Sequence, residues 1–262
     1  MGLIDRFLPE RLPRQVVFAG DRQAETFRLR DGRIAGRAPA PGTALAENAG
    51  DGWAGLVAAL PVEETGVIFN AAPFIYNFFE FDKLPWQPRA LRELVSWRLQ
   101  KIFPEDIAAY DHRFFSLDKK RVFSILVRRS LLERVEEAFA QKRVPLTYIG
   151  NSTMEILARA RRAKVPPDFI IESDSASCTM VFQSRRSPIY IRKFKSASPA
   201  DTVEEIGKTV AFVRGQYGIE PRRYWLHDHQ GRADATEAAL AGGDYSRLRS
   251  GLGETPHIPG TP

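Results

Sequence analysis

The stretch from Phe169 to Phe194 constrains the fold of this chain more than any other part of the sequence. It reads FIIESDSASCTMVFQSRRSPIYIRKF, in which two polar turns separate three apolar runs rich in β-branched and aromatic residues. Apolar runs of this length, bounded by turn residues, are typical of strands. We therefore expect three consecutive strands at 169–171, 178–182 and 189–194.

The rest of the chain alternates further strands with amphipathic helices. Capping boxes at Ser130–Glu133 and Ser152–Glu155 predict two helix starts, and residues 36–52, rich in Ala, Pro and Gly, predict a surface loop. Hairpins are predicted at 16–29 and 112–127, and single strands at 66–70, 146–149 and 222–226. Further helices are predicted after Trp53, Pro88 and Ser198, and Gly218 ends the last of these.

Composition excludes several classes of protein. The 262 residues are 44% hydrophobic and 27% charged, which is typical of a soluble globular protein. A single cysteine, Cys178, excludes internal disulfides and favours a reducing compartment. No apolar run approaches the ~20 residues that cross a bilayer, and the N-terminus does not have the form of a signal peptide. The net charge of +6 indicates an anionic neighbour, but the basic residues are spread along the chain and form no recognised nucleic-acid signature.

The order and spacing of these elements resemble the actin-like ATPase superfold, and most of all the PilM-like proteins of type IV pilus assembly and the cytoplasmic part of type II secretion platform proteins. The resemblance implies an α/β fold of the actin-like (ribonuclease H-like) type, with two domains and an inserted subdomain of the FtsA type. The subdomain that closes the adenine side would be missing, because only SASPA separates Phe194 from the next helix. The implied divisions are an N-terminal segment 1–15, part of a first domain 16–83, the insert 84–146, a return helix 147–165, a shortened second domain 166–230 and a disordered tail 231–262.

The turns that bind phosphate in this family are altered here. The family pattern is Asp-hydrophobic-Gly followed by a polar residue. The matching positions are Phe18, Ala19, Gly20 and Asp21 in the first turn, and Glu172, Ser173 and Asp174, followed by Ser177, in the second. Phosphate binding needs free backbone amides and no competing negative charge. We therefore expect no cofactor, no bound metal and no ATPase activity, so that the chain is not an enzyme.

Other chemistry receives little support from the sequence. His227 and His229 could form a metal pair, but without a third ligand a solvated strand end is the better interpretation. Cys178 lies in an apolar run and is expected to be a buried thiol. The carboxylates of Glu172 and Asp174 could hold a cation, or Arg185 and Arg186 could neutralise them.

The resemblance also implies a function. PilM-like proteins hold a short peptide of a membrane-anchored neighbour between the first domain and the insert, so we expect a degenerate scaffold with a PilN-like partner. A cytoplasmic secretion ATPase is a further possible partner, and the protein would lie in the cytoplasm, peripheral at the inner membrane. The residues expected at the peptide groove are Phe74, Tyr76, Phe78, Trp86 and Trp97.

Three alternatives stay open at this point. The aromatic stretch 74–81 could be a strand buried on both sides, and Trp97, which lies off the apolar stripe of its helix, could contact the core instead of a peptide. The chain could also be a working actin-like ATPase. Finally, its positive charge could belong to an adaptor that binds nucleic acid.

Overall fold

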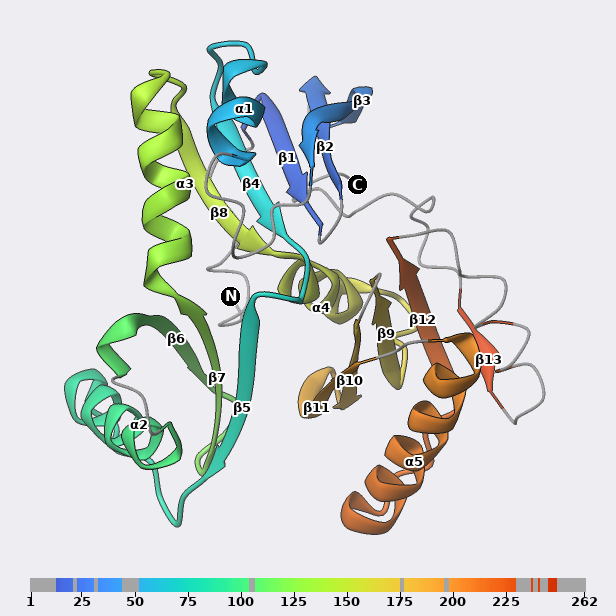
Figure 1. Cartoon of the computed structure of the whole chain (residues 1–262). Helices are drawn as coiled ribbons and strands as arrows, with labels where there is room; N and C mark the ends of the chain where they lie inside the picture. The colour runs from blue at the N-terminus through green and yellow to red at the C-terminus, as the bar shows by residue number, and fades with distance from the viewer. Residues whose placement is uncertain are drawn as a thin grey trace.

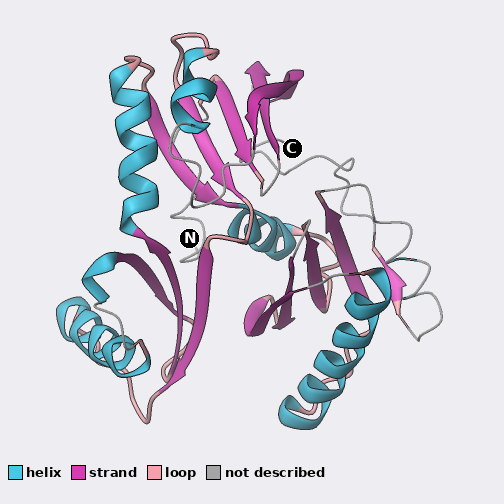
Figure 2. Cartoon of the chain, in the orientation of Figure 1, coloured by secondary structure: helices cyan, strands magenta, loops and turns pink. Residues whose placement is uncertain are grey.

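The computed structural model describes residues 13–20, 23–30, 33–43, 52–103, 107–174, 177–195 and 198–229, together with residues 237, 240 and 245–248. Two five-stranded sheets and one three-stranded sheet are arranged around a central helix, α4 (Ser152–Arg162) (Figures 1 and 2). The mixed α/β class that the sequence predicts is confirmed. No helix in these ranges is both long and apolar enough to span a membrane.

The first sheet has the strand order β3-β2-β1-β4-β8. Its strands are β1 (Gln15–Ala19), β2 (Gln23–Arg30), β3 (Arg33–Thr43), β4 (Thr65–Phe69) and β8 (Leu146–Asn151). Strands β4 and β8 run parallel to β1, whereas β2 and β3 are antiparallel additions. Every residue of β1 and β4 is buried, because α1 (Gly52–Ala58) and α3 (Arg129–Gln141) contribute to the core on one side of this sheet.

The second sheet repeats that order as β11-β10-β9-β12-β13. Its strands are β9 (Phe169–Ser173), β10 (Ser177–Ser184), β11 (Ser187–Lys195), β12 (Arg223–Asp228) and β13 (Ser246–Arg247), so the three strands expected between 169 and 194 are confirmed. Helix α5 (Pro199–Tyr217) covers it with Ile206, Val210 and Val213. The helix ends where predicted, because Gly218 adopts the left-handed conformation (φ 63°) that closes a helix without strain.

The third sheet, β5-β7-β6, is inserted between β4 and α3. It consists of β5 (Phe74–Glu80), β6 (Tyr110–Ser116) and β7 (Arg121–Arg128), and carries α2 (Pro88–Ile102) and the short helix η2 (Ile107–Ala109). The side chains of β7 alternate between its two faces. Val122 and Leu126 pack with α2, whereas Phe123, Ile125 and Val127 join the core beside α3. The sheet starts at Phe74, ten residues before the expected boundary at 84, since β5 pairs with β7 along its whole length.

Three local predictions differ from the structure. Residues 36–43 continue β3 instead of forming a loop, and the prolines at 39 and 41 are tolerated because β3 is an edge strand. Helix α3 has no side-chain cap at Ser130, because β7 continues directly into the helix and places Ser130 inside it. The Ser152–Glu155 box is not formed either, since Asn151 caps α4 by accepting from the Met154 amide.

Part of the remaining predictions lies outside the described residues. These are the segment 1–12, Asp21, the turn at 31–32, and residues 44–51. The expected tail 231–262 is described only at Glu237, Leu240 and 245–248. There Leu240 is buried in the second core and β13 pairs with β12.

Candidate functional site

The parallel strands of the two large sheets end at one junction, on either side of the start of α4 (Figure 1). The carboxyl ends of parallel strands at such a junction are where open α/β sheets take their ligands. Glu172 lies at the end of β9, and the residues that follow β12 bring His229 beside it.

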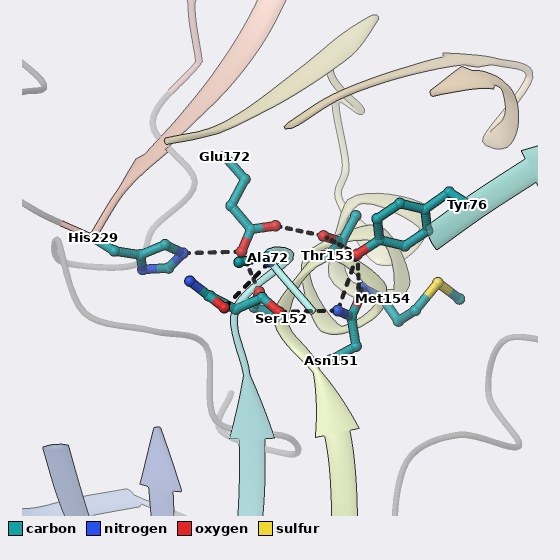
Figure 3. A network of polar contacts seen from close by, with 9 residues as sticks. Ala72, Tyr76, Asn151, Ser152, Thr153, Met154, Glu172 and His229 are labelled. Atoms are coloured by element: carbon teal, nitrogen blue, oxygen red, sulfur yellow. Dashed lines mark hydrogen bonds and ion pairs between the residues drawn. The ribbon is translucent and has the colours of Figure 1, made fainter. Parts of the chain in front are cut away.

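The carboxylate of Glu172 is the centre of a buried hydrogen-bond network (Figure 3). It accepts hydrogen bonds from the Ser152 and Thr153 hydroxyls at the start of α4, the latter with an O···O distance of 2.5 Å. His229 Nε2 lies 3.0 Å from the same carboxylate, and the two side chains are 6% and 2% exposed. This is a fully enclosed ion pair, which requires its additional hydrogen bonds to compensate for lost hydration.

The network continues into the first half of the chain. The Tyr76 hydroxyl of β5 donates to Thr153 Oγ1 at 3.1 Å and accepts from Asn151 Nδ2 at 3.0 Å. Asn151 Nδ2 also approaches the Asn70 carbonyl oxygen at the end of β4, at 3.4 Å. One chain of hydrogen bonds therefore runs from Asn151 through Tyr76 and Thr153 to the Glu172 carboxylate. In such an arrangement, successive bonds strengthen one another.

Each member of the pair favours the charged form of the other. Burial alone would raise the pKa of Glu172, but the hydrogen bond and the charge of His229, with the two hydroxyls, hold it below its usual value. Burial alone would lower the pKa of His229, and the hydrogen bond and charge of Glu172, with the nearby Asp174 and Asp228, raise it instead. The junction thus stabilises an imidazolium beside a carboxylate.

Other groups complete the filling. The Phe18 ring, near the end of β1, lies 4.8 Å from the His229 ring, measured between centroids. From β11, Lys193 donates to the main-chain oxygens of Ala71 and Ala72 just beyond β4. The protein's own side chains therefore occupy the place where the two halves meet.

This geometry corrects two alternatives drawn from the sequence. His229 is not at a solvated strand end, because its ring is enclosed by Glu172 and Phe18. Arg185 and Arg186 do not neutralise Glu172, since they form the β10–β11 turn at the opposite end of β10, where Arg186 donates to the Arg161 carbonyl oxygen.

The remaining residues singled out in the sequence take structural positions. Cys178 is buried, as predicted, and burial with the charges of Glu172 and Asp228 raises the pKa of its thiol to about 12. Asp174 is buried, and its amide donates to the Ser177 carbonyl oxygen. Across the described ranges, no three His, Cys, Asp or Glu side chains lie together as metal ligands would.

The sequence interpretation missed Ser152 and Thr153, which it assigned to a helix cap, and the partnership of His229 with Glu172. One signal could have found them. Polar residues follow three apolar strands in the sequence, at Asn151, Glu172 and His227, and the ends of parallel strands converge at one edge of a sheet.

A second concave region lies between the first sheet and the insert. This groove, of about 1660 Å³, is bounded by strand β6, by strand β8 and by one side of α3. Its apolar lining includes Phe114, Leu132, Leu146 and Ile149, each only partly buried. Charged side chains of both signs line it as well, namely Glu64, Arg92, Asp111, Arg113, Arg129 and Glu136.

The five residues expected at a peptide groove are divided among three places. Phe74 lines the groove. The rings of Tyr76 and Phe78 lie against the buried Phe123, at centroid distances of 6.2 and 4.9 Å. Trp86, just before α2, and Trp97, within α2, are both exposed and lie outside the groove lining.

Comparisons with known proteins identify the fold. No protein-family model matches the sequence, and no curated protein matches it. Among solved structures, the PilM-PilN type IV pilus biogenesis complex superposes with a TM-score of 0.67 at 14% identity, over 90% of this chain and 88% of that one. The cytoplasmic domain of EpsL, an inner membrane component of the type II secretion system of Vibrio cholerae, gives 0.57 at 9% identity, over 82% and 81%.

A third structure carries the name of the fold. A Bacteroides thetaiotaomicron protein with an actin-like ATPase fold and unknown function gives a TM-score of 0.56 at 7% identity, covering 92% of this chain and 91% of that one. Identities this low establish a common fold. The chain thus has the actin-like fold that the sequence resemblance predicts, in the arrangement found in PilM and the EpsL cytoplasmic domain.

Proposed function

We propose that this protein is a non-catalytic scaffold of a type IV pilus or type II secretion-like assembly platform, and that its groove holds a short peptide of a membrane-anchored, PilN-like partner. The observation that carries the proposal is the groove between β6, β8 and α3. It lies between the first sheet and the insert, and the fold is shared with a protein solved as a PilM-PilN complex.

The walls of the groove have the chemistry that an extended peptide requires. In the described part of the chain, β6 pairs only with β7 and β8 pairs only with β4, so each strand leaves one edge toward the groove without a strand partner. A peptide can add to such an edge through main-chain hydrogen bonds, while pockets select its side chains. Leu132 and Ile149 offer apolar contacts, and Arg113 and Glu136 offer charges of both signs.

The absence of catalysis in this proposal rests on the filled junction. A triphosphate between the two halves would meet the Glu172 carboxylate, and the cation nearest to that carboxylate, His229, is already paired with it. Lys193 is bound to carbonyl oxygens beyond β4 and is not directed at an open space. A phosphate site needs free donors and no competing negative charge, and the described part of this junction places the Glu172 carboxylate where a phosphate would bind.

Titration of the groove with peptides tests the proposal. Labelled synthetic peptides, taken from the N-terminal cytoplasmic segments of platform proteins encoded beside this gene, would be titrated by fluorescence polarisation. We expect one of them to bind saturably. Leu132→Arg places a charge on the apolar wall and should weaken binding by about 2 kcal/mol, roughly 30-fold.

Two further variants locate the site. Val62→Arg adds the same charge at an exposed position outside the groove lining and should bind like the wild type. Trp97→Ala should also bind normally, because Trp97 lies outside the groove lining; the sequence-based expectation of Trp97 as the peptide anchor requires that it abolish binding. Unchanged affinity of Leu132→Arg, or no binding of any platform peptide, contradicts the proposal.

A further inference from the structure

Two exposed tryptophans lie at α2, one just before the helix and one within it. Trp86 immediately precedes the N-cap residue Gln87 and is 88% exposed, and Trp97, in the second half of the helix, is 49% exposed. The other two tryptophans of the chain, Trp53 and Trp225, are each 3% exposed. Large aromatic side chains are highly buried on average, so two exposed ones at one helix require an explanation.

The packing of α2 against the insert does not explain the exposed Trp97. Helix α2 buries Val95 and Leu99 against Phe79, Val122 and Leu126 of the insert. At about 100° per residue, Trp97 lies roughly 160° around the helix from both buried positions. Trp97 thus faces away from the core of the insert, and its ring holds the Lys101 ammonium 3.8 Å from its centroid.

The surroundings of the two tryptophans are basic. Residues 82–102 contain five Lys or Arg and two Asp or Glu, and one of the acids, Glu93, is paired with Arg89 at 3.1 Å. The β6–β7 turn adds Lys119 and Lys120, whose carbonyl oxygens accept from the Leu84 and Phe81 amides. The acid of that turn, Asp118, is already bound by Arg121. The basic side chains around the exposed rings therefore outnumber the acidic ones.

We propose that this surface, formed by Trp86, Trp97, Lys101 and the basic side chains around them, binds directly to an anionic lipid bilayer. Tryptophan is enriched at the membrane–water interface, where its ring contacts the acyl boundary and its N–H stays hydrated. Lys and Arg bind the anionic headgroups while their alkyl parts cover apolar surface. An excess of cations around exposed indoles complements such a bilayer better than the mixed charges of the groove would.

The bilayer surface and the peptide groove use different defining residues. Helix α2 packs on Val122 and Leu126 of the inserted sheet, and its Arg92 reaches the lining of the groove. Trp86, Trp97 and Lys101 are not part of that lining. The inference therefore does not depend on the proposed peptide.

Tryptophan fluorescence reports on this surface selectively, because the other two indoles are already buried. The full-length protein would be mixed with vesicles of 30% phosphatidylglycerol in phosphatidylcholine, and with pure phosphatidylcholine vesicles. We expect a blue shift of emission and quenching by brominated lipid with the anionic vesicles alone, both lost at high salt. An unshifted spectrum with anionic vesicles overturns the proposal.

Matched variants separate this surface from net charge. The double variant Arg98→Glu, Lys101→Glu should lower vesicle partitioning at least 10-fold in sedimentation. The control double variant Arg28→Glu, Arg30→Glu makes an equal charge change on exposed residues of β2. It should lower partitioning by less than threefold. Trp86→Ser with Trp97→Ser should likewise reduce partitioning, with an unchanged unfolding midpoint. Two results would refute the assignment of this surface to a bilayer. One is an equal loss of vesicle partitioning in the two charge-reversal variants. The other is a variant of this surface that no longer binds a protein partner but still binds vesicles normally.

Discussion

The first sheet meets its two neighbours in opposite ways. At its junction with the second sheet, charged and aromatic side chains from five elements fill the space, and the Glu172–His229 pair is almost fully enclosed. At its junction with the insert, a groove of about 1660 Å³ lies between two strands that, within the described residues, each have one edge without a strand partner. One junction contains a buried polar network, and the other contains an open groove.

The two halves contribute equivalent positions to the first of these junctions. Phe18 and Glu172 are each the fourth residue of the first strand in their halves, and both point into the junction where they meet. One supplies a ring and the other a carboxylate paired with His229, so equivalent positions make packing and electrostatic contacts. The groove that we propose for a peptide lies on the side of the first sheet that faces the insert.

Replacing Glu172 with Ala should have the largest effect on the filled junction. The variant leaves His229 buried beside Phe18 without its counter-ion, which we expect to lower the free energy of unfolding by about 3 kcal/mol. For a chain of this size, that corresponds to a fall in Tm of roughly 6–12 °C. Calorimetry would measure it, with Glu93→Ala as the control, since the exposed Arg89–Glu93 pair contributes less than about 0.5 kcal/mol. Similar Tm values for the two variants would mean that the junction is not held by this pair.

A smaller effect should appear in the pH dependence of Tm. His229 has a raised pKa, so its stabilising charge is fully present below the ordinary histidine value of 6.5 and is lost as pH rises through the higher folded value. Glu172 has a lowered pKa, so its contribution is lost only as pH falls below 4.5. The pair should therefore stabilise most between these limits, and Tm should fall as pH rises above 6.5.

A second buried carboxylate provides the internal control for this measurement. Glu155 accepts from the Tyr148 hydroxyl, and burial raises its pKa to about 7 although Tyr148 and the charge of Arg162 act in the opposite direction. Folding favours the neutral form of Glu155. Ionisation of this residue therefore lowers the free energy of unfolding as pH rises from 4.5 through 7. Glu155→Gln should remove that part and leave the fall that follows His229, which the Glu172→Gln, His229→Gln double variant should remove. A Tm of the Glu155→Gln variant that does not fall as pH rises above 6.5 would contradict a raised pKa of His229.

The filled junction predicts no measurable response to nucleotide. Calorimetric titration with Mg-ATP should give no saturable heat, and Tm should not shift, because binding to the folded state would raise it by mass action. Inorganic phosphate serves as a control for weak anion binding elsewhere on this basic protein. Saturable binding of Mg-ATP at micromolar concentration would show that the network opens, and the comparison between the two junctions would then fail.

The fold could be predicted from the sequence wherever a signal is local. Helix α5 is an example, because its cap at Ser198, its apolar spacing and the left-handed Gly218 all lie within one stretch of chain. The three strands after Phe169 were predicted for the same reason. Strand β3 was not, since its prolines and glycines indicate a loop unless the free edge of the sheet is already known.

The site could be predicted only in part, because its contacts are distant in sequence. Glu172 bonds to Ser152, 20 residues away, and to His229, 57 residues away, and neither contact has a local pattern. The sequence resemblance predicts altered turns at Phe18 and Glu172, but it does not predict the contacts that these two residues make. The open groove depends on how the insert lies beside α3 and β8, which no pattern in the sequence specifies.

Helix α4 has a mechanical consequence for the whole molecule. Its first residues are bound to Glu172, its last turn accepts from Arg186, and eight of its eleven residues are buried between the sheets. The helix is therefore fastened to the second sheet at both ends while its flanking strand β8 belongs to the first. A load applied at the edge of β8 would therefore act on these hydrogen bonds at both ends of α4 as well as on the connecting chain.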